Sequence, residues 1–406
     1  MVRTTVVAAA VLVLLLAPAL PAASAAAPAP SPDTGASDGV EALTEPIPVQ
    51  RNTTAVLLFG PDERGALDTP GPDLSTALAT GHDTTAGTID DRTLRRRYAA
   101  ADNETRRDLL SAALERISAR IDGLDATERT VRRGYANGTY TSSEAVERLA
   151  GLDPVARSLD DTLGFAERKA DDLSADDLRS TARTLRSSLV AHYGPVRERL
   201  ADAVVDGGPS APTYAAGTAS GVRFGVVENG THYHESYEFP ETTSQSPSGV
   251  SIDAAEERAS DLYPWAWNAS TRTTIDVVGS ETYRVTLHHP HGTLTSYIDV
   301  ASLDVIKETQ RTDLTAYPPG PATEPTESGD LAVVVNRTYP GGPLRVRALD
   351  TDGAPVNASV RVANEDAGYT GDDGVAWAVG GGGNAFTVTL EHGEDQVSKS
   401  VLPLSS

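Results

Sequence analysis

The spacing of apolar residues changes near residue 205, and this change limits most strongly what the chain can fold into. Between residues 91 and 205 apolar side chains recur every three or four positions, as Leu110, Leu114 and Ile117 do. That period places them on one face of an α-helix. Beyond residue 208 apolar and polar residues alternate over short runs, which is the period of a half-buried β-strand. The sequence therefore predicts helices first and sheets afterwards.

At 406 residues the chain is too long for one ordinary core, so we expect several domains. The expected fold class is a multidomain protein with an all-α helical bundle or coiled-coil hairpin, a small α+β domain and a C-terminal β-sandwich. The expected segments are a signal peptide (1–25), a disordered linker (26–50), a short strand and loop region (51–90), the helical bundle (91–205), the α+β domain (208–315), a proline-rich linker (316–330) and the sandwich (331–406).

The first 25 residues have the pattern of a signal peptide. Arg3 supplies a positive charge, residues 6–17 are apolar, and Ala23-Ser24-Ala25 is a small-residue cleavage site. The apolar run is too short and too broken by proline for a membrane span. We therefore expect export, cleavage, and no transmembrane segment in the mature chain.

Asparagine is concentrated in acceptor triplets for N-glycosylation. Seven of the nine asparagines stand in Asn-x-Ser/Thr, far more than chance would place there. The predicted acceptors are Asn52, Asn103, Asn137, Asn229, Asn268, Asn336 and Asn357. Because this modification takes place outside the cytosol on exposed segments, we expect an extracellular or cell-surface glycoprotein that carries N-linked glycans.

The charge is strongly acidic. The 34 basic residues, of which only three are lysine, face 57 acidic ones, for a formal net charge of −23. An acidic chain so poor in lysine resembles proteins of extreme halophiles, because concentrated salt screens the repulsion between carboxylates. Such a charge repels phosphate and argues against a nucleic-acid partner. The absence of cysteine excludes disulfides and thiol chemistry.

The α+β segment contains a helix followed by three strand-like runs. They are Ala254-Ala255-Glu256-Glu257-Arg258-Ala259, then Tyr283-Arg284-Val285-Thr286-Leu287, and Tyr297-Ile298-Asp299-Val300 followed by Val305-Ile306-Lys307. This order resembles a PepSY-like domain, although Ala301-Ser302-Leu303-Asp304 replaces the glycine turn usual in that family. The resemblance implies an extracytoplasmic module, linked in that family to peptidase propeptides and envelope proteins.

The C-terminal segment alternates strands with Asp-Gly turns. Leu344-Arg345-Val346-Arg347-Ala348-Leu349 precedes the turn Asp350-Thr351-Asp352-Gly353, and Ala358-Ser359-Val360-Arg361-Val362 follows. The pattern resembles the immunoglobulin-like or carboxypeptidase-regulatory-like sandwich domains of surface proteins. Such domains hold other modules or bind partners.

Histidines form two groups that we considered as metal ligands. They are His232 and His234, which share a strand face, and His288, His289 and His291 around a predicted hairpin turn. We predict no metal and no other cofactor there, because polar side chains at a turn are usually solvated. Trp265 and Trp267, two residues apart, are expected on one strand face as packing residues, with carbohydrate contact as the alternative.

No catalytic constellation stands out in the sequence. We therefore expect a non-enzymatic secreted or cell-surface glycoprotein that acts as an interaction or scaffold module in a high-salt envelope. Its expected partner is another envelope or secreted protein. Two alternatives stay open: an extracellular peptidase regulator that uses the PepSY-like segment, and a histidine-based metal-binding protein.

Overall fold

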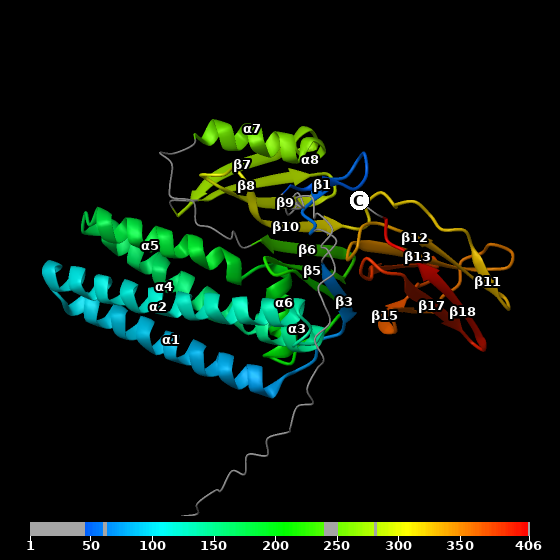
Figure 1. Cartoon of the computed structure of the whole chain (residues 1–406), viewed down its shortest axis with the longest axis horizontal. Helices are drawn as coiled ribbons and strands as arrows, with labels where there is room; N and C mark the ends of the chain where they lie inside the picture. The colour runs from blue at the N-terminus through cyan, green and yellow to red at the C-terminus, as the bar shows by residue number, and fades with distance from the viewer. Residues whose placement is uncertain (1–44, 60–62, 239–250, 280–281, 405–406) are drawn as a thin grey trace, which may run out of the picture. The chain divides into compact units, whose positions relative to one another are not determined.

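A computed structural model describes residues 45–59, 63–238, 251–279 and 282–404. The described residues belong to the second of the two units into which the chain divides, Ala42–Ser406. The expected signal peptide (1–25) and most of the expected linker (26–50) lie outside the described residues. The second unit contains helices, antiparallel sheets and a C-terminal β-rich part, so the expectation of a multidomain α+β chain is confirmed (Figure 1).

Six α-helices lie in the sequence between the first and the second strand of the main sheet. They are α1 (Leu74–Ala100), α2 (Asn103–Ala136), α3 (Ser142–Ala150), α4 (Leu152–Asp172), α5 (Asp176–Leu189) and α6 (Pro195–Val204), with a 3-10 turn η1 (Val190–His192) before the last. Side chains fix several starts: Asp73 accepts a hydrogen bond from the Thr76 amide at 2.7 Å, and Thr141 forms a capping box with Glu144. Such caps satisfy amides that have no partner within the helix.

The expected loop region at residues 51–90 is wrong from residue 74 onward, because α1 begins at Leu74. The residues 74–90 contain many threonines and glycines, which have low helix propensity. Packing against α4 overrides that propensity. Thr80 and Gly87 are buried there, and side chains of α2 and α4 lie close to Gly87, where a larger residue would crowd them.

An eight-stranded antiparallel sheet follows, in the order β3-β4-β5-β6-β10-β9-β8-β7. Its strands are β3 (Arg64–Asp68), β4 (Thr213–Gly217), β5 (Gly221–Glu228), β6 (Thr231–Glu238), β7 (Arg272–Val278), β8 (Thr282–His289), β9 (Gly292–Asp299) and β10 (Val305–Asp313). The central pair is β6 with β10, in which Lys307 lies opposite Tyr237 and Glu308 opposite Ser236. Because side chains alternate, consecutive residues of β10 point to opposite faces of the sheet.

Helices α1–α6 do not form a bundle with a core of its own. Their largest apolar cluster continues into the sheet through Ala215, Val222, Phe224 and Val226. The expectation of a separate all-α bundle at residues 91–205 is therefore wrong. The apolar period of a helix shows that one face is buried, but it does not show whether a helix or a sheet covers that face.

The opposite face of the sheet is covered by α7 (Ile252–Leu262), α8 (Pro264–Ala269) and the segment around Leu57. This segment includes strand β2 (Ala55–Val56), which pairs with β1 (Ile47–Pro48). Trp265 and Trp267 lie in α8, so the expectation that they share a strand face is wrong. Figure 1 shows α7 and α8 on one side of the sheet and α1–α6 on the other.

The C-terminal part is a β-sandwich of two four-stranded sheets, β11-β12-β13-β16 and β15-β14-β17-β18. Its strands are β11 (Thr326–Ser328), β12 (Leu331–Asn336), β13 (Pro343–Asp350), β14 (Ser359–Val362), β15 (Glu365–Tyr369), β16 (Val375–Val379), β17 (Phe386–His392) and β18 (Asp395–Val401). Aliphatic side chains from both sheets fill the space between them. The expected linker at 316–330 is wrong at its end, because β11 is an edge strand of the sandwich, a position that tolerates neighbouring prolines.

Candidate functional site

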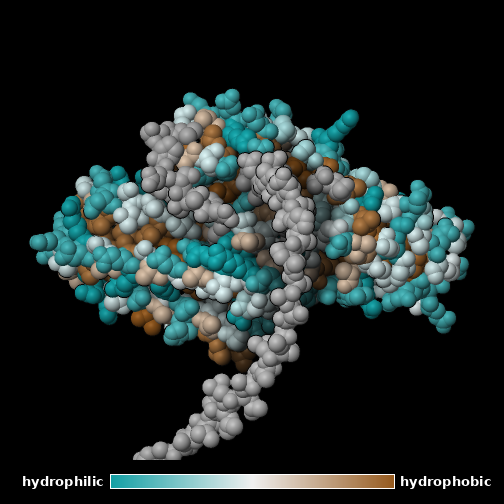
Figure 2. All heavy atoms as spheres, viewed as in Figure 1, coloured by the Kyte–Doolittle hydropathy of each residue, from teal (hydrophilic) through white to brown (hydrophobic). Residues whose placement is uncertain are grey.

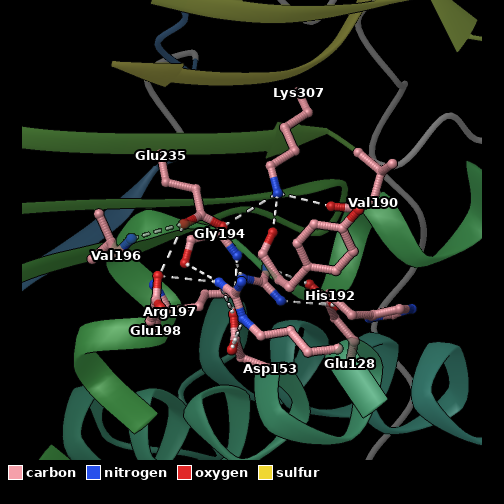
Figure 3. Close-up of polar contacts among 12 residues, drawn as sticks. Glu128, Asp153, Val190, His192, Gly194, Val196, Arg197, Glu198, Glu235 and Lys307 are labelled. Atoms are coloured by element: carbon pink, nitrogen blue, oxygen red, sulfur yellow. Dashed lines mark hydrogen bonds and ion pairs between the residues drawn. The ribbon is translucent and has the colours of Figure 1, made fainter. Parts of the chain in front are cut away.

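A buried ionic network lies where the helices meet the sheet (Figure 3). The Arg197 guanidinium of α6 donates to Glu128 of α2 at 2.8 and 3.3 Å, and both side chains are fully buried. His192 lies between two carboxylates, with Nδ1 2.6 Å from Glu128 and Nε2 2.7 Å from Asp125. Two carboxylates at the two ring nitrogens favour the doubly protonated, cationic ring.

The pKa values in this network follow from burial and charge together. Burial alone raises the pKa of Glu128, but Arg197 and His192 outweigh burial and lower it to about 2. Burial lowers the pKa of His192, and the hydrogen bonds to Asp125 and Glu128 raise it overall above its ordinary value. Both shifts favour the charged forms of Glu128 and His192.

Glu235 of β6 extends the network to the sheet. Its carboxylate accepts from the backbone amides of Val196 and Arg197 at the start of α6, at 3.2 and 3.4 Å, and lies 3.2 Å from the Arg197 Nε. A carboxylate at a helix N-terminus is stabilised by the free amides and the helix dipole. Gly194 makes the approach possible, because a Cβ at that position would collide with the Glu235 carboxylate.

Lys307 of β10 closes the network on the sheet side. Its Nζ lies 3.6 Å from Glu235 and donates to the carbonyls of Val190, at 2.8 Å, and Tyr193. Burial lowers the pKa of this lysine, and Glu235 opposes that effect. Glu128, Arg197, Glu235 and Lys307 are each at most 2 % exposed in their side chains, so a substrate does not reach them.

The opposite face of the sheet carries a second polar cluster, which holds the segment around Leu57. Glu308 of β10 accepts from the Leu57 amide at 3.1 Å, from the Tyr263 hydroxyl at 2.8 Å and from Gln310 at 2.8 Å. Ser236 donates to the Leu57 carbonyl at 2.9 Å. Side chains of β6 and β10 thus replace the backbone partners that a buried irregular segment lacks.

We predict that substituting Glu308→Gln reduces the pH dependence of stability between pH 4.5 and 7. Burial raises the pKa of Glu308 from 4.5 to about 7, although Gln310, Tyr263 and Leu57 act against burial. A raised folded-state pKa means that the stabilisation is complete below the ordinary value and is lost as the pH rises through about 7. Urea unfolding at several pH values in concentrated salt measures this slope.

A second buried carboxyl, Glu238, contributes to the same pH dependence and is still present in the Glu308→Gln variant. Burial and then Asp304 raise the pKa of Glu238 to about 7, so part of the slope persists. A slope as steep in the variant as in the wild type is the result that contradicts the prediction. At acid pH the variant is less stable by about 1 kcal/mol, because the amide accepts one hydrogen bond fewer.

The main sheet and the sandwich also meet through buried polar groups. Arg223 of β5 donates to Glu63 and, at 2.5 Å, to the Pro340 carbonyl, while Tyr214 donates to Glu63 at 2.6 Å. His232, of the first predicted histidine group, lies beside Gly341 with its Nε2 3.4 Å from the carbonyl. The pKa of His232 is lowered to about 4, mainly by burial. The hydrogen bond to Gly341 acts to raise this pKa, whereas the positive charge of Arg223 acts to lower it.

The five candidate histidines do not meet at one point. His234 is fully buried and places Nε2 2.8 Å from Ser236, whose hydroxyl hydrogen is used by the Leu57 carbonyl. His288 bonds Thr293 at 3.1 Å on the other face of β8 from His289. His289 and His291 pack against Trp265 of α8. Among the residues that the structure describes, no group of three or more His, Cys, Asp or Glu side chains is placed to hold a metal ion.

A polar groove of about 710 Å³ opens between α1, α2, α3 and α4, away from both buried clusters. Its lining is rich in hydroxyls and small residues and includes six charged side chains: Asp73, Asp83, Glu144, Glu147, Arg120 and Arg148. Figure 2 shows hydrophilic residues over much of the visible face of the helical part and of the sandwich, with small apolar groups between them. Its hydroxyls and its charges of both signs suit contact with a polar ligand or segment.

The predicted glycan acceptors lie mostly at the surface. Six of the seven asparagines are exposed, namely Asn52, Asn103, Asn137, Asn229, Asn268 and Asn357. Asn336 is an exception: it is buried in β12, and its Nδ2 donates to the Gly320 carbonyl at 2.8 Å. The folded chain has no room for a sugar there, so the prediction of an acceptor at Asn336 is not supported.

We therefore predict that Asn336 stays unmodified in the native protein, while glycans occupy only the six exposed positions. The reason is that the Asn336 amide nitrogen is enclosed and already donates a hydrogen bond. Peptide mapping by mass spectrometry of protein from its natural source measures the occupancy of each acceptor. A glycan on Asn336 at an occupancy similar to that of Asn357, the other acceptor in the sandwich, contradicts the prediction.

No helix among the described residues is both long enough and apolar enough to cross a membrane. The molecule is a multidomain α+β protein that ends in an immunoglobulin-like sandwich. Residues 1–210 match the family model of a domain of unknown function, DUF7096; this is more than half of the 406 residues, and the chain belongs to that family. Residues 214–318 match a second family of unknown function, DUF7094, and residues 322–399 match an archaeal fibronectin-III type-like domain. No curated protein and no solved structure matches the chain.

The boundaries of these matches agree with the architecture. The third match begins before β11, in accord with the β-bridge between Ala322 and Asn336 that ties the proline-rich segment to the sandwich. The second covers β4–β10, seven of the eight strands of the main sheet, and the eighth, β3, comes from the first. The first two family regions therefore share one sheet.

Proposed function

We propose that this chain is a non-enzymatic, exported and N-glycosylated interaction module of an archaeal cell envelope. The observation that carries the proposal is the distribution of acceptor triplets: seven of nine asparagines stand in them, and six are exposed across all parts of the described chain. The archaeal fibronectin-III-like match supports a modular archaeal protein. The net charge of −23 supports a high-salt setting.

The distribution of charges supports a binding role over a catalytic one. The titratable groups Glu128, Arg197 and Glu235 are fully or almost fully buried and contact one another. Groups so enclosed stabilise the junction between helices and sheet. The exposed groove between α1 and α4 offers hydroxyls and charges of both signs, which suit contact with a polar segment of an envelope partner.

The groove can be tested with a matched pair of threonines on α2. Thr127 lines the groove, whereas Thr130 lies outside it; both are exposed, and both hydroxyls bond the carbonyl four residues earlier. Crosslinking in intact cells, followed by mass spectrometry, identifies neighbours and the crosslinked positions. We expect a reproducible partner whose crosslinks to the groove are lost with Thr127→Trp and kept with Thr130→Trp. Equal loss or equal retention in the two variants counts against the groove.

Export and glycosylation need their own experiment. Intact-mass spectrometry of the protein from its natural source reports cleavage near residue 25 and attached sugar in one measurement. A cytoplasmic, unglycosylated product that retains the first residues contradicts the proposal.

Peptidase regulation is the second candidate, and one observation favours it. The residues that resemble a PepSY-like domain fall in the expected elements, with Tyr283 to Leu287 in β8 and Val305 to Lys307 in β10. Because this segment shares its sheet and core with other parts, the test uses the whole protein. It is added to secreted protease of the same organism in brine, and an unchanged proteolytic rate at saturating protein dismisses this role.

A further inference from the structure

We propose that His289 and His291, together with the indole of Trp265, form a binding site for a soft monovalent metal ion such as Cu(I). The site lies between β8, the β8–β9 turn and α8. It goes beyond the proposed interaction role and does not depend on it.

The first argument is the set of ring nitrogens that lack partners. His289 is 7 % exposed, and neither its Nδ1 nor its Nε2 has a hydrogen-bond partner in the described structure; the same holds for the buried Nδ1 of His291. Leaving a buried polar atom without a partner is unfavourable, and such an atom calls for an unseen water or ion. One such nitrogen on each of two neighbouring rings points to a ligand shared between the rings.

The geometry of the two rings fits one ion between them. Their centroids are 6.1 Å apart and their planes are perpendicular. An imidazole nitrogen binds such metals at about 2.0–2.1 Å, which leaves room for a single ion bridging two rings at this separation. Two neutral nitrogen ligands match the low coordination number that d¹⁰ monovalent ions accept.

The aromatic surroundings favour a single positive charge. Trp265 stacks on His291 with centroids 4.7 Å apart and meets His289 edge-on at 5.3 Å, and Tyr317 packs on His291 at 5.9 Å. Aromatic rings attract cations through their negative faces.

The other histidine group does not meet these conditions. His232 and His234 already bond Gly341 and Ser236 through their Nε2 atoms. The Arg223 guanidinium is close enough to lower the pKa of both rings, and the same positive charge repels a metal cation.

The test is a titration of the full chain with Ag(I), a stable substitute for Cu(I), and with Cu(I) under reducing, oxygen-free conditions. Nitrate replaces chloride in the brine, because chloride precipitates silver. We expect one ion per chain, and tryptophan fluorescence that changes on binding because Trp265 borders the site. His289→Ala and His291→Ala each weaken binding more than about 100-fold, beyond the loss typical of outer-shell substitutions.

His288→Ala is the matched control, because His288 lies on the same hairpin, points to the other face and bonds Thr293. It is expected to bind as the wild type does. If the alanine variants do not fold, nitrogen-detected spectra of the wild-type histidine rings give the answer without substitution: only His289 and His291 shift at one equivalent of ion. Absence of a shift at those two rings means that their nitrogens are hydrated only, and the proposal is then wrong.

Discussion

Substituting Arg197→Met lowers the free energy of unfolding by about 3–5 kcal/mol, the largest effect that we expect of any single replacement in this chain. The Arg197 guanidinium faces Glu128 at 2.8 Å and Glu235 at 3.2 Å, with all three side chains buried. Removing it leaves two buried carboxylates near each other with less compensating charge, and a buried unpaired charge costs far more than the intact pair contributes.

The measurement is urea unfolding in concentrated potassium chloride, followed through the helical circular dichroism signal. The control is Arg179→Met, which removes an arginine of α5 that pairs with Asp171 and Asp176 at the surface. The free energy of unfolding of that variant is expected to fall by no more than about 1 kcal/mol. Similar losses in the two variants contradict the structural role of the network.

A double-mutant cycle separates the ion pair from simple loss of volume. Glu128→Gln is combined with Arg197→Met, and the two losses are expected to be non-additive by about 0.5–3 kcal/mol because the side chains are in contact. Additive losses mean that Glu128 and Arg197 act independently, against the geometry described here.

Transfer from about 1 M to about 0.1 M salt lowers the melting temperature by at least about 10 °C. This shift corresponds to a loss of several kcal/mol in the free energy of unfolding. The net charge of −23 is the reason. The screening length is about 3 Å at the higher salt concentration and about 10 Å at the lower, so repulsion between surface carboxylates reappears on dilution. The buried pairs, such as Arg197 with Glu128, are screened much less and hold in both conditions.

The control separates screening from water exclusion. A neutral osmolyte added at low salt strengthens burial but does not screen charge. It is therefore expected to restore only a small part of the lost stability. A melting temperature that does not change on dilution, or that an osmolyte restores fully, refutes the salt-adaptation hypothesis.

Most strands of the main sheet could be predicted from the sequence, whereas elements that depend on distant contacts could not. The alternation of apolar and polar residues beyond residue 208 corresponds to strands such as β5, β6, β7 and β8, because alternation is a local signal. The part of α1 before residue 91 was missed because its sequence lacks an apolar period and its helix depends on contacts with α4. β3 was missed because it is short and joins β4, about 150 residues away in the chain, through pairing that no local pattern shows.

The polar clusters were missed for the same reason. Glu128, His192, Arg197, Glu235 and Lys307 come from five separate elements, and none has a sequence neighbour that marks it as buried. The one available signal was in β10, where Lys307, Glu308 and Gln310 stand inside a strand that has partners on both sides. A charged residue in a central strand indicates a buried partner, but it does not show which one.

The sequence by itself determined the properties that depend on composition and on neighbours along the chain. These are the order of helices before sheets, the acidic and lysine-poor charge, and the seven acceptor triplets, whose placement needs no folded partner. Only the tertiary structure decided which faces are covered, that Asn336 is enclosed, and that His289 meets His291 and Trp265 while His232 meets Gly341. Contacts of this second kind join residues distant in sequence, and their energies arise from burial and charge that exist only after the chain has folded.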